Sequence, residues 1–223
     1  MSAAMNTIVP ARGFRVPRCA GCALTPELCV CALWEPLASD LAISVVMPPS
    51  EERSASNSAR LLALWLPASE RFVRGAAASI APDALAARPG SALLFPGASG
   101  QECLPRSPVR HLIVPDGTWS QARRIERRCF GRSPLPQVSL SAEWPSVYEL
   151  RRARSGVCTF EAIAIAIGLL SDRAVASSLL DRFSEWAARA RSLKTGGPLG
   201  RPASRAAEGA HPAARRLGAA HDD

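Results

Sequence analysis

The sequence predicts an α/β fold in which helices flank a mostly parallel β-sheet, preceded by a small cysteine-rich module. Short apolar runs typical of buried strands alternate with segments of helical periodicity. Four of the seven cysteines lie before residue 39. The chain has 223 residues, of which 48% are hydrophobic, which suits one domain with appendages.

The composition divides the chain into three expected parts. Residues 1–38 hold the four clustered cysteines, and residues 39–192 hold the alternating strands and helices. Residues 193–223 are dominated by Gly, Pro, Ala and Arg. Because this last segment offers little apolar surface to bury, we expect it to be disordered.

The elements follow from local patterns. The run 41–47 (LAISVVM) predicts a buried strand that ends at Pro48 and Pro49. Residues 54–66 begin with residues suited to helix capping and become leucine-rich, so a helix is expected that stops before Pro67. Further strands are expected at 71–74, 92–95, 111–114 and 137–140, and further helices at 118–129, 160–170 and 183–191.

Two turns follow strands of the expected sheet. Phe95-Pro96-Gly97 ends one apolar run, and Pro115-Asp116-Gly117-Thr118 ends another. Ligands of open parallel sheets bind at the carboxyl ends of the strands. The sequence therefore predicts a ligand pocket between these two turns.

The cysteine module has the spacing of a metal site. Cys19, Cys22, Cys29 and Cys31 form a C-x2-C-x6-C-x-C pattern, in which four thiolates can complete one tetrahedral zinc site. Such a closed site is structural, because no coordination position is left for a substrate. The alternative is a set of ordinary or transiently oxidised cysteines. Cys103, Cys129 and Cys158 are interpreted as buried small hydrophobic residues.

The charge favours polyanionic partners. The formal net charge is +8, and the basic residues are almost all arginine, which binds phosphate bidentately and stacks on bases. A GC-rich coding sequence would produce the same bias. The N-terminus lacks the apolar core of a secretory signal, and the longest apolar run, 160–170, is shorter than the roughly 20 residues of a membrane span. We therefore expect a cytoplasmic protein.

Several ordered motifs resemble the DTW-domain family of tRNA-uridine aminocarboxypropyltransferases. Asp116-Gly117-Thr118-Trp119 resembles its Asp-x-Thr-Trp signature, and the cysteines resemble its CxxC…CxC cluster. The other matching elements are Ser56-Asn57-Ser58-Ala59-Arg60-Leu61, Leu94-Phe95-Pro96-Gly97, Tyr148-Glu149-Leu150-Arg151-Arg152 and Cys158-Thr159-Phe160-Glu161-Ala162. Ser58 stands where the family has Thr, and Pro48 replaces the His of its His-Pro-x-Glu element.

The resemblance implies a SPOUT-like knotted α/β fold, with S-adenosylmethionine as the donor of a 3-amino-3-carboxypropyl group to N3 of a tRNA uridine. Asp116 is then the candidate base, or the hydrogen-bonding partner of the uracil edge. Its alternative role is to cap a turn. Trp119 offers a ring for stacking a base or adenine, and its alternative role is core packing.

A second set of residues is expected to bind the donor. Phe95, Pro96 and Gly97 allow main-chain groups to approach adenine, although a plain turn has the same sequence. The N-terminus of the helix with Thr159 and Glu161 is expected to bind the donor's amino-acid group, and its alternative is ordinary helix capping. The full set expected at the donor is Leu94, Phe95, Pro96, Gly97, Thr118, Tyr148, Arg151, Thr159 and Glu161.

The expected RNA contacts lie around this pocket. They are Asn57, Arg60, Arg123, Arg124 and Arg127, with Arg128 and Arg152 as neighbours. A solvated basic face is the ordinary alternative. Two other functions remain open: an S-adenosylmethionine-dependent RNA methyltransferase of the SPOUT type, and a zinc-containing RNA-binding protein without catalysis.

Overall fold

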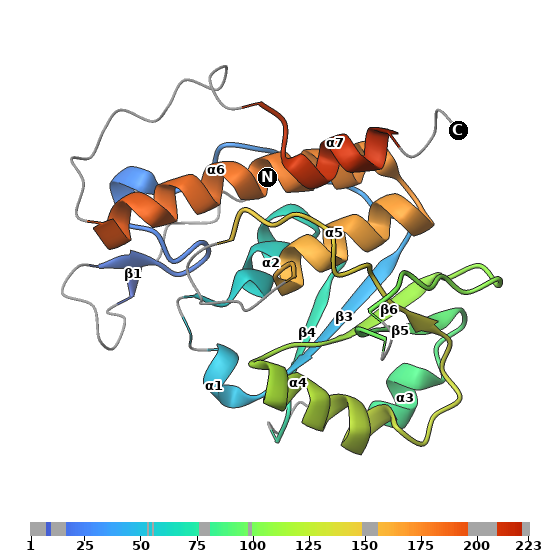
Figure 1. Cartoon of the computed structure of the whole chain (residues 1–223). Coiled ribbons are helices and arrows are strands. Elements are labelled where there is room, and N and C mark those ends of the chain that lie inside the picture. The colour runs from blue at the N-terminus through green and yellow to red at the C-terminus, as the bar shows by residue number, and fades with distance from the viewer. Residues whose placement is uncertain are drawn as a thin grey trace.

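Figure 1 shows the chain as a computed structural model. The residues that it describes are 8–9, 17–52, 54, 56–75, 81–97, 100–148, 156–195 and 209–219.

A five-stranded sheet forms the centre of the fold, in the order β4-β3-β6-β5-β7, and every ladder in it is parallel. The strands are β3 (Ala42–Met47), β4 (Glu70–Val73), β5 (Ser91–Leu94), β6 (His111–Pro115) and β7 (Gln137–Val138). The sequence prediction of five strands is confirmed, with ends shifted by one or two residues. Because β5 and β6 are neighbours, the two turns that follow them meet at one edge of the sheet.

Helices cover both faces of the sheet (Figure 1). One face carries α2 (Leu62–Trp65), α5 (Thr159–Leu170), α6 (Arg173–Thr195) and α7 (Pro212–Ala219). The other carries α3 (Pro82–Ala86), α4 (Trp119–Ile125) and a π-helical turn, Glu126–Phe130. In the chain, α1 (Pro49–Glu52) and a 3-10 turn, Ser58–Leu61, follow β3 and precede α2. Each face buries its own apolar cluster, so the expected helix-flanked parallel sheet is confirmed.

The cysteine module shares the main core. It contains β1 (Ile8–Val9), β2 (Arg18–Cys19) and a 3-10 turn, Pro26–Leu28. Its apolar residues Leu24, Leu28 and Val30 belong to the same buried cluster as α5 and α6. The Trp186 indole donates a 2.9 Å hydrogen bond to the carbonyl of Cys22. The module is therefore packed against α6 as part of one domain.

Three sequence expectations need correction. The helix expected at 54–66 begins later, because the Asn57 side chain caps the turn by accepting from the Arg60 N–H at 3.2 Å. The helix expected at 183–191 extends over Arg173–Thr195. Residues 193–223 were expected to be disordered, but α7 lies within them and buries Ala213, Ala214 and Leu217. Its alanines are strong helix formers, which outweighs the low-complexity composition.

Among the described residues, no helix is both long enough and apolar enough to cross a membrane.

Candidate active site

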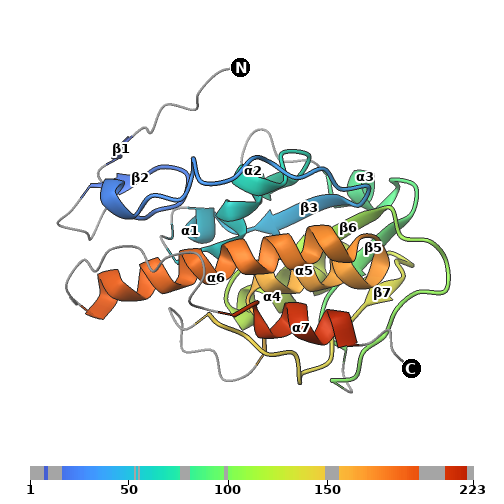
Figure 2. The same cartoon turned by 90° about the horizontal axis from the view of Figure 1, so that it is seen from above.

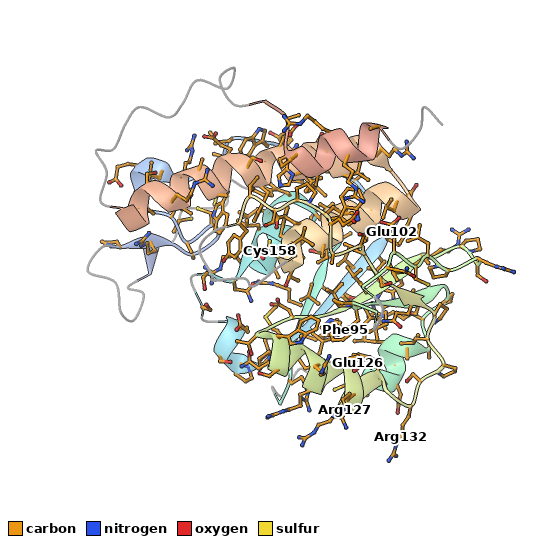
Figure 3. All side chains as sticks on the ribbon, viewed as in Figure 1. Phe95, Glu102, Glu126, Arg127, Arg132 and Cys158 are labelled. Atoms are coloured by element: carbon orange, nitrogen blue, oxygen red, sulfur yellow. The ribbon has the colours of Figure 1, made fainter. Side chains whose placement is uncertain are left out.

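The carboxyl ends of β5 and β6 bring two aromatic rings together. Phe95 follows β5 and Trp119 begins α4, and their rings stack with centroids 5.7 Å apart and planes 11° apart. Phe95 is buried, whereas Trp119 is 57% exposed. The Arg123 guanidinium lies 5.6 Å from the Trp119 ring centroid. The two turns between which a ligand pocket is expected therefore lie side by side, and an accessible aromatic surface lies beside Phe95, which Figure 3 labels.

Asp116 is held between two other segments. Its Oδ2 accepts a 2.7 Å hydrogen bond from the Asn57 amide, and its Oδ1 accepts a 2.6 Å hydrogen bond from the Thr159 hydroxyl. Only 4% of Asp116 is exposed. The same Asn57 amide lies 3.5 Å from Oε2 of Glu51, which is also buried. Two buried carboxyl groups therefore share one amide at the end of β6.

The turn between Asp116 and Trp119 requires glycine. Gly117 has a φ of +143°, and a Cβ atom there would lie 2.9 Å from Cβ of Gln121. The Gln121 side chain accepts hydrogen bonds from both the backbone N–H and the hydroxyl of Thr118, at 2.8 and 2.9 Å. Its amide donates to Ser50 at 3.2 Å. These bonds fix the start of α4 and the position of Trp119.

The loop after β5 is anchored by β7. The backbone N–H of Phe95 donates to the Val138 carbonyl, and Gln137 donates to the Phe95 carbonyl, both at 3.0 Å. A Cβ atom on Gly97 would lie 3.2 Å from Oγ of Ser139. Leu94 is buried in the sheet, while Pro96 is exposed. Of the expected donor residues, Phe95 therefore contacts Trp119, Pro96, Gly97 and Thr118 belong to the same two turns, and Leu94 lies in β5 before them.

Glu161 lies apart from this surface. It is fully buried, and its carboxylate accepts four hydrogen bonds: from Ser146, the backbone N–H groups of Val147 and Cys158, and His211. Burial alone raises the pKa of Glu161, but the hydrogen bonds from His211, Ser146 and the two N–H groups outweigh it and lower the pKa. Because a carboxylate has about four acceptor positions, this geometry does not favour a role in binding the donor's ammonium group.

The N-terminus of α5 is largely occupied as well. The N–H of Cys158 donates to the Glu161 carboxylate, and the N–H of Phe160 donates to Oγ of Ser58. The N–H of Glu161 is directed to the Cys158 side chain. The expectation of an open carboxylate-binding helix end is therefore not favoured by the geometry. Figure 3 marks this end of α5 by Cys158. Thr159 nevertheless reaches the site, through Asp116.

Tyr148 belongs to the core. Its hydroxyl donates to the Ser56 carbonyl, and its ring packs against Phe183 and Trp186 at 5.9 and 6.1 Å. It is buried, which does not favour the expected contact with the donor. Arg151 and Arg152 lie outside the described residues.

The residues expected to contact RNA fall into two groups. Arg123, Arg124, Arg127 and Arg128 are exposed on α4 and the π-helical turn, and Figure 3 shows Arg127 pointing away from the sheet. Asn57 is 3% exposed and supports the site from within, whereas Arg60 is half-buried and donates to the carbonyls of Glu52 and Ser54. Glu51 also lies at this site. No role was predicted for it from the sequence, although it is the last residue of the Pro48-Pro49-Ser50-Glu51 element.

The four cysteines converge. Their sulfur atoms lie within 4.8 Å of one another, with 3.4 Å between Cys19 and Cys31 and 3.7 Å between Cys22 and Cys29. Four ligands at about 2.3 Å from a tetrahedral zinc ion are about 3.8 Å apart, so the sulfur positions fit such an ion. The hydrogen bond from Cys31 lowers the pKa of the Cys22 thiol to about 5. Of the three cysteines expected to be buried small hydrophobic residues, Cys103 is exposed on the loop before β6, and Cys129 and Cys158 are half-buried.

A cavity of about 240 Å³ lies on the face of the sheet covered by α3 and the π-helical turn, next to β3 and β4. Its lining includes Phe72, Arg74, Leu85, Arg128 and Phe130. Neither of the two site turns lines it, so it is separate from the expected ligand pocket.

Comparison with known proteins finds related sequences. The DTW domain family matches residues 16–191. The tRNA-uridine aminocarboxypropyltransferase 2 of Macaca fascicularis is 30% identical over 171 residues, which cover 70% of this chain and 57% of that protein. The protein of the same name from Mus musculus is 31% identical over 171 residues, with the same two coverages. The chain therefore spans little more than half the length of these relatives. The comparison with solved structures found no match.

The family match covers the cysteine module, the sheet and both turns of the site. The chain belongs to the DTW domain family.

Proposed function

We propose that this protein transfers the 3-amino-3-carboxypropyl group of S-adenosylmethionine to N3 of a tRNA uridine. The named activity of the relatives supports the reaction class. The observation that carries the proposal is the buried Asp116, hydrogen-bonded on both oxygens, next to the exposed Trp119 ring at the edge of a parallel sheet.

The reaction forms a bond between uridine N3 and the γ-carbon of the donor's methionine arm. The bond from that carbon to the sulfonium sulfur breaks, and methylthioadenosine leaves with the bonding electron pair. The N3 proton also has to leave. Because the sulfonium already activates the leaving group, the protein's tasks are to align the reactants and to accept this proton.

Asp116 is the proposed proton acceptor. Asn57 donates to one oxygen of this carboxylate and Thr159 to the other, and these bonds orient it. Exposure increases along the turn from Asp116 to Trp119, so a uridine edge is proposed to enter from the Trp119 side. Substituting Asp116 therefore removes the base without removing the aromatic surface.

The stacked pair Phe95 and Trp119 is proposed to hold a flat ring, either adenine of the donor or the target base. Pro96 and Gly97 border this pair on the exposed side. The arginines of α4 continue outward from it, and their position supports contact with phosphates around the target uridine.

Zinc is the proposed metal at the four cysteines, which would hold the module against α6. Its role would be structural, because the thiolates complete the coordination shell. The SPOUT-like knot and the cytoplasmic location remain predictions that follow from the family resemblance and from the sequence.

The test is incubation of the purified protein with S-adenosylmethionine and tRNA, followed by mass spectrometry of nucleosides and of the nucleoside product of the donor. The proposal requires an aminocarboxypropyl uridine and methylthioadenosine in equal amounts. A methylated base with adenosylhomocysteine would replace the proposal by a methyltransferase. Binding of tRNA without either product would leave an RNA-binding protein.

A further inference from the structure

A buried histidine near the C-terminus contacts the site's supporting network. His211 is 1% exposed, and its Nε2 lies 3.2 Å from Oε1 of Glu161. Its Nδ1 accepts a 3.0 Å hydrogen bond from the N–H of Ala213. Because Nδ1 is an acceptor, the proton of the neutral ring lies on Nε2, which donates to Glu161. His211 lies beyond residues 16–191, the part that matches the family.

The segment that carries His211 leads into α7, which lies against α5 and α6 (Figure 2). The backbone N–H of His211 donates to Asp181 of α6 at 2.9 Å. Leu217 of α7 packs so closely on Gly168 of α5 that a Cβ atom there would lie 2.8 Å from it. The Arg216 guanidinium lies 4.5 Å from the Trp144 ring centroid. The histidine is therefore held in place independently of its bond to Glu161.

From Glu161, one set of contacts leads to Thr159. The Glu161 carboxylate accepts from the N–H of Cys158 at 2.8 Å, which fixes the residue directly before Thr159. Thr159 in turn donates to Oδ1 of Asp116. A shift of Glu161 would therefore move the first turn of α5, and with it one donor to Asp116.

A second set of contacts leads from Glu161 to Asn57. The carboxylate accepts from Ser146 at 2.7 Å and from the N–H of Val147 at 2.8 Å. The next residue, Tyr148, donates to the carbonyl of Ser56. Ser56 precedes Asn57, which donates to Oδ2 of Asp116. Both donors to Asp116 are thus connected to the same buried glutamate.

We propose that His211 is a positioning residue for the catalytic centre: its hydrogen bond to Glu161 fixes both segments that orient the Asp116 carboxylate. The inference rests on the proposed function of Asp116. It assigns to the C-terminal segment, which the family match does not include, a part in the geometry of the site.

The experiment compares His211→Leu with His211→Gln in the full-length protein. Leu removes the donor to Glu161, while the amide of Gln can replace it. His211→Leu should lower kcat about tenfold or more, since a buried acceptor loses a bond, while KM for both substrates stays within about twofold. His211→Gln should restore most of kcat. A Gln variant as slow as the Leu variant would overturn the proposal.

A destabilised control separates positioning from loss of stability. Leu85→Ala empties a buried position on α3, on the opposite face of the sheet, and should lower stability by about 2–5 kcal/mol. Assayed well below its Tm, it should keep kcat near that of the unmodified protein. A kcat as low in Leu85→Ala as in His211→Leu would mean that His211 acts only through stability, which would overturn the proposal.

A readout without turnover distinguishes the two proposals. Hydrogen–deuterium exchange of the segments 144–148 and 156–163 should be faster in His211→Leu than in His211→Gln or Leu85→Ala. If the unmodified protein transfers no group to tRNA but this difference appears, the proposed function fails, while the role of His211 in fixing the two segments stands. Equal exchange in all variants would overturn the role of His211 whatever the activity.

Discussion

The Thr159 hydroxyl donates a 2.6 Å hydrogen bond to Oδ1 of Asp116, although 43 residues separate the two in the chain. Asn57, from a third segment, donates to the other oxygen at 2.7 Å. Asp116 at the end of β6 is therefore oriented by a 3-10 turn on one side and by α5 on the other. A carboxylate held in this way is suited to accepting a proton from a fixed direction.

Asp116→Asn should abolish most turnover and keep the fold. The Thr159 hydroxyl can rotate to accept from the new amide nitrogen while the amide oxygen still accepts from Asn57, so both contacts survive. Loss of a general base typically reduces kcat about 10²- to 10⁴-fold. The measurement is kcat together with Tm and metal content. Full turnover with unchanged Tm would exclude Asp116 as the base.

Thr159→Val should slow the reaction and Thr159→Ser should not. Valine keeps the shape of threonine but leaves Oδ1 of Asp116 without this donor, whereas serine keeps the hydroxyl. Loss of a hydrogen bond to a buried group costs about 1–3 kcal/mol, which corresponds to roughly a 5- to 150-fold lower rate if the bond acts in the transition state. Single-turnover rates at saturating substrates are the measurement. Equal rates for the two variants would show that the hydroxyl has only a structural role.

The sequence was most informative about the sheet. The apolar runs predicted the three central strands, β3, β5 and β6, because a strand buried on both faces has a continuous apolar sequence. The sequence also placed the two turns at the carboxyl ends of strands, where a pocket was expected between them. The stacking of Phe95 on Trp119 at that edge is seen only in the structure. The pairing of Asp116 with Asn57 and Thr159 did not, because it depends on how α5 and the 3-10 turn pack, which no local pattern encodes.

The sequence was least informative where composition and packing disagree. Ala213, Ala214 and Leu217 place small and apolar residues on one side of α7, but the Gly, Pro and Arg residues around them suggested disorder. The family resemblance suggested Glu161 as a ligand of the donor, yet its four acceptor positions are filled by protein donors that come from as far as His211. Tertiary contacts, and not local preference, decide both cases.

Trp119→Ala should weaken substrate binding without lowering stability. The side chain is 57% exposed, so little core packing is lost. Stacking on an aromatic side chain contributes about 1–3 kcal/mol per base, so KM for the donor or for tRNA should rise roughly 5- to 150-fold. Trp119→Phe keeps a ring over Phe95 and serves as the matched control. An Ala variant with unchanged KM for both substrates would rule out stacking at this position.

Cys19→Ser should release bound metal and lower Tm, whereas Cys103→Ser should do neither. Cys19 is one of the four converging thiols and lies in the main apolar cluster, while Cys103 is exposed and outside the cluster. Because the module also packs against α6, losing the metal should loosen that contact. Metal analysis of the purified proteins gives the answer. We expect one zinc ion per chain in the Cys103→Ser protein and none in the Cys19→Ser protein.

Replacing Arg124 and Arg127 together by Gln should weaken tRNA binding in a salt-dependent way. Both are exposed on the same basic surface, and among the described residues neither forms an ion pair. If each contacts a phosphate, the slope of log Kd against log salt should fall by about 1 to 2 in the double variant. Because neither contacts Trp119 or Asp116, kcat at saturating tRNA should be unchanged. Arg106→Gln combined with Arg110→Gln, both exposed on the loop before β6, removes the same two charges and is the control for net charge. An unchanged slope in the double variant would identify these arginines as an ordinary solvated face, since a phosphate contact cannot be removed without reducing the number of ions that binding releases.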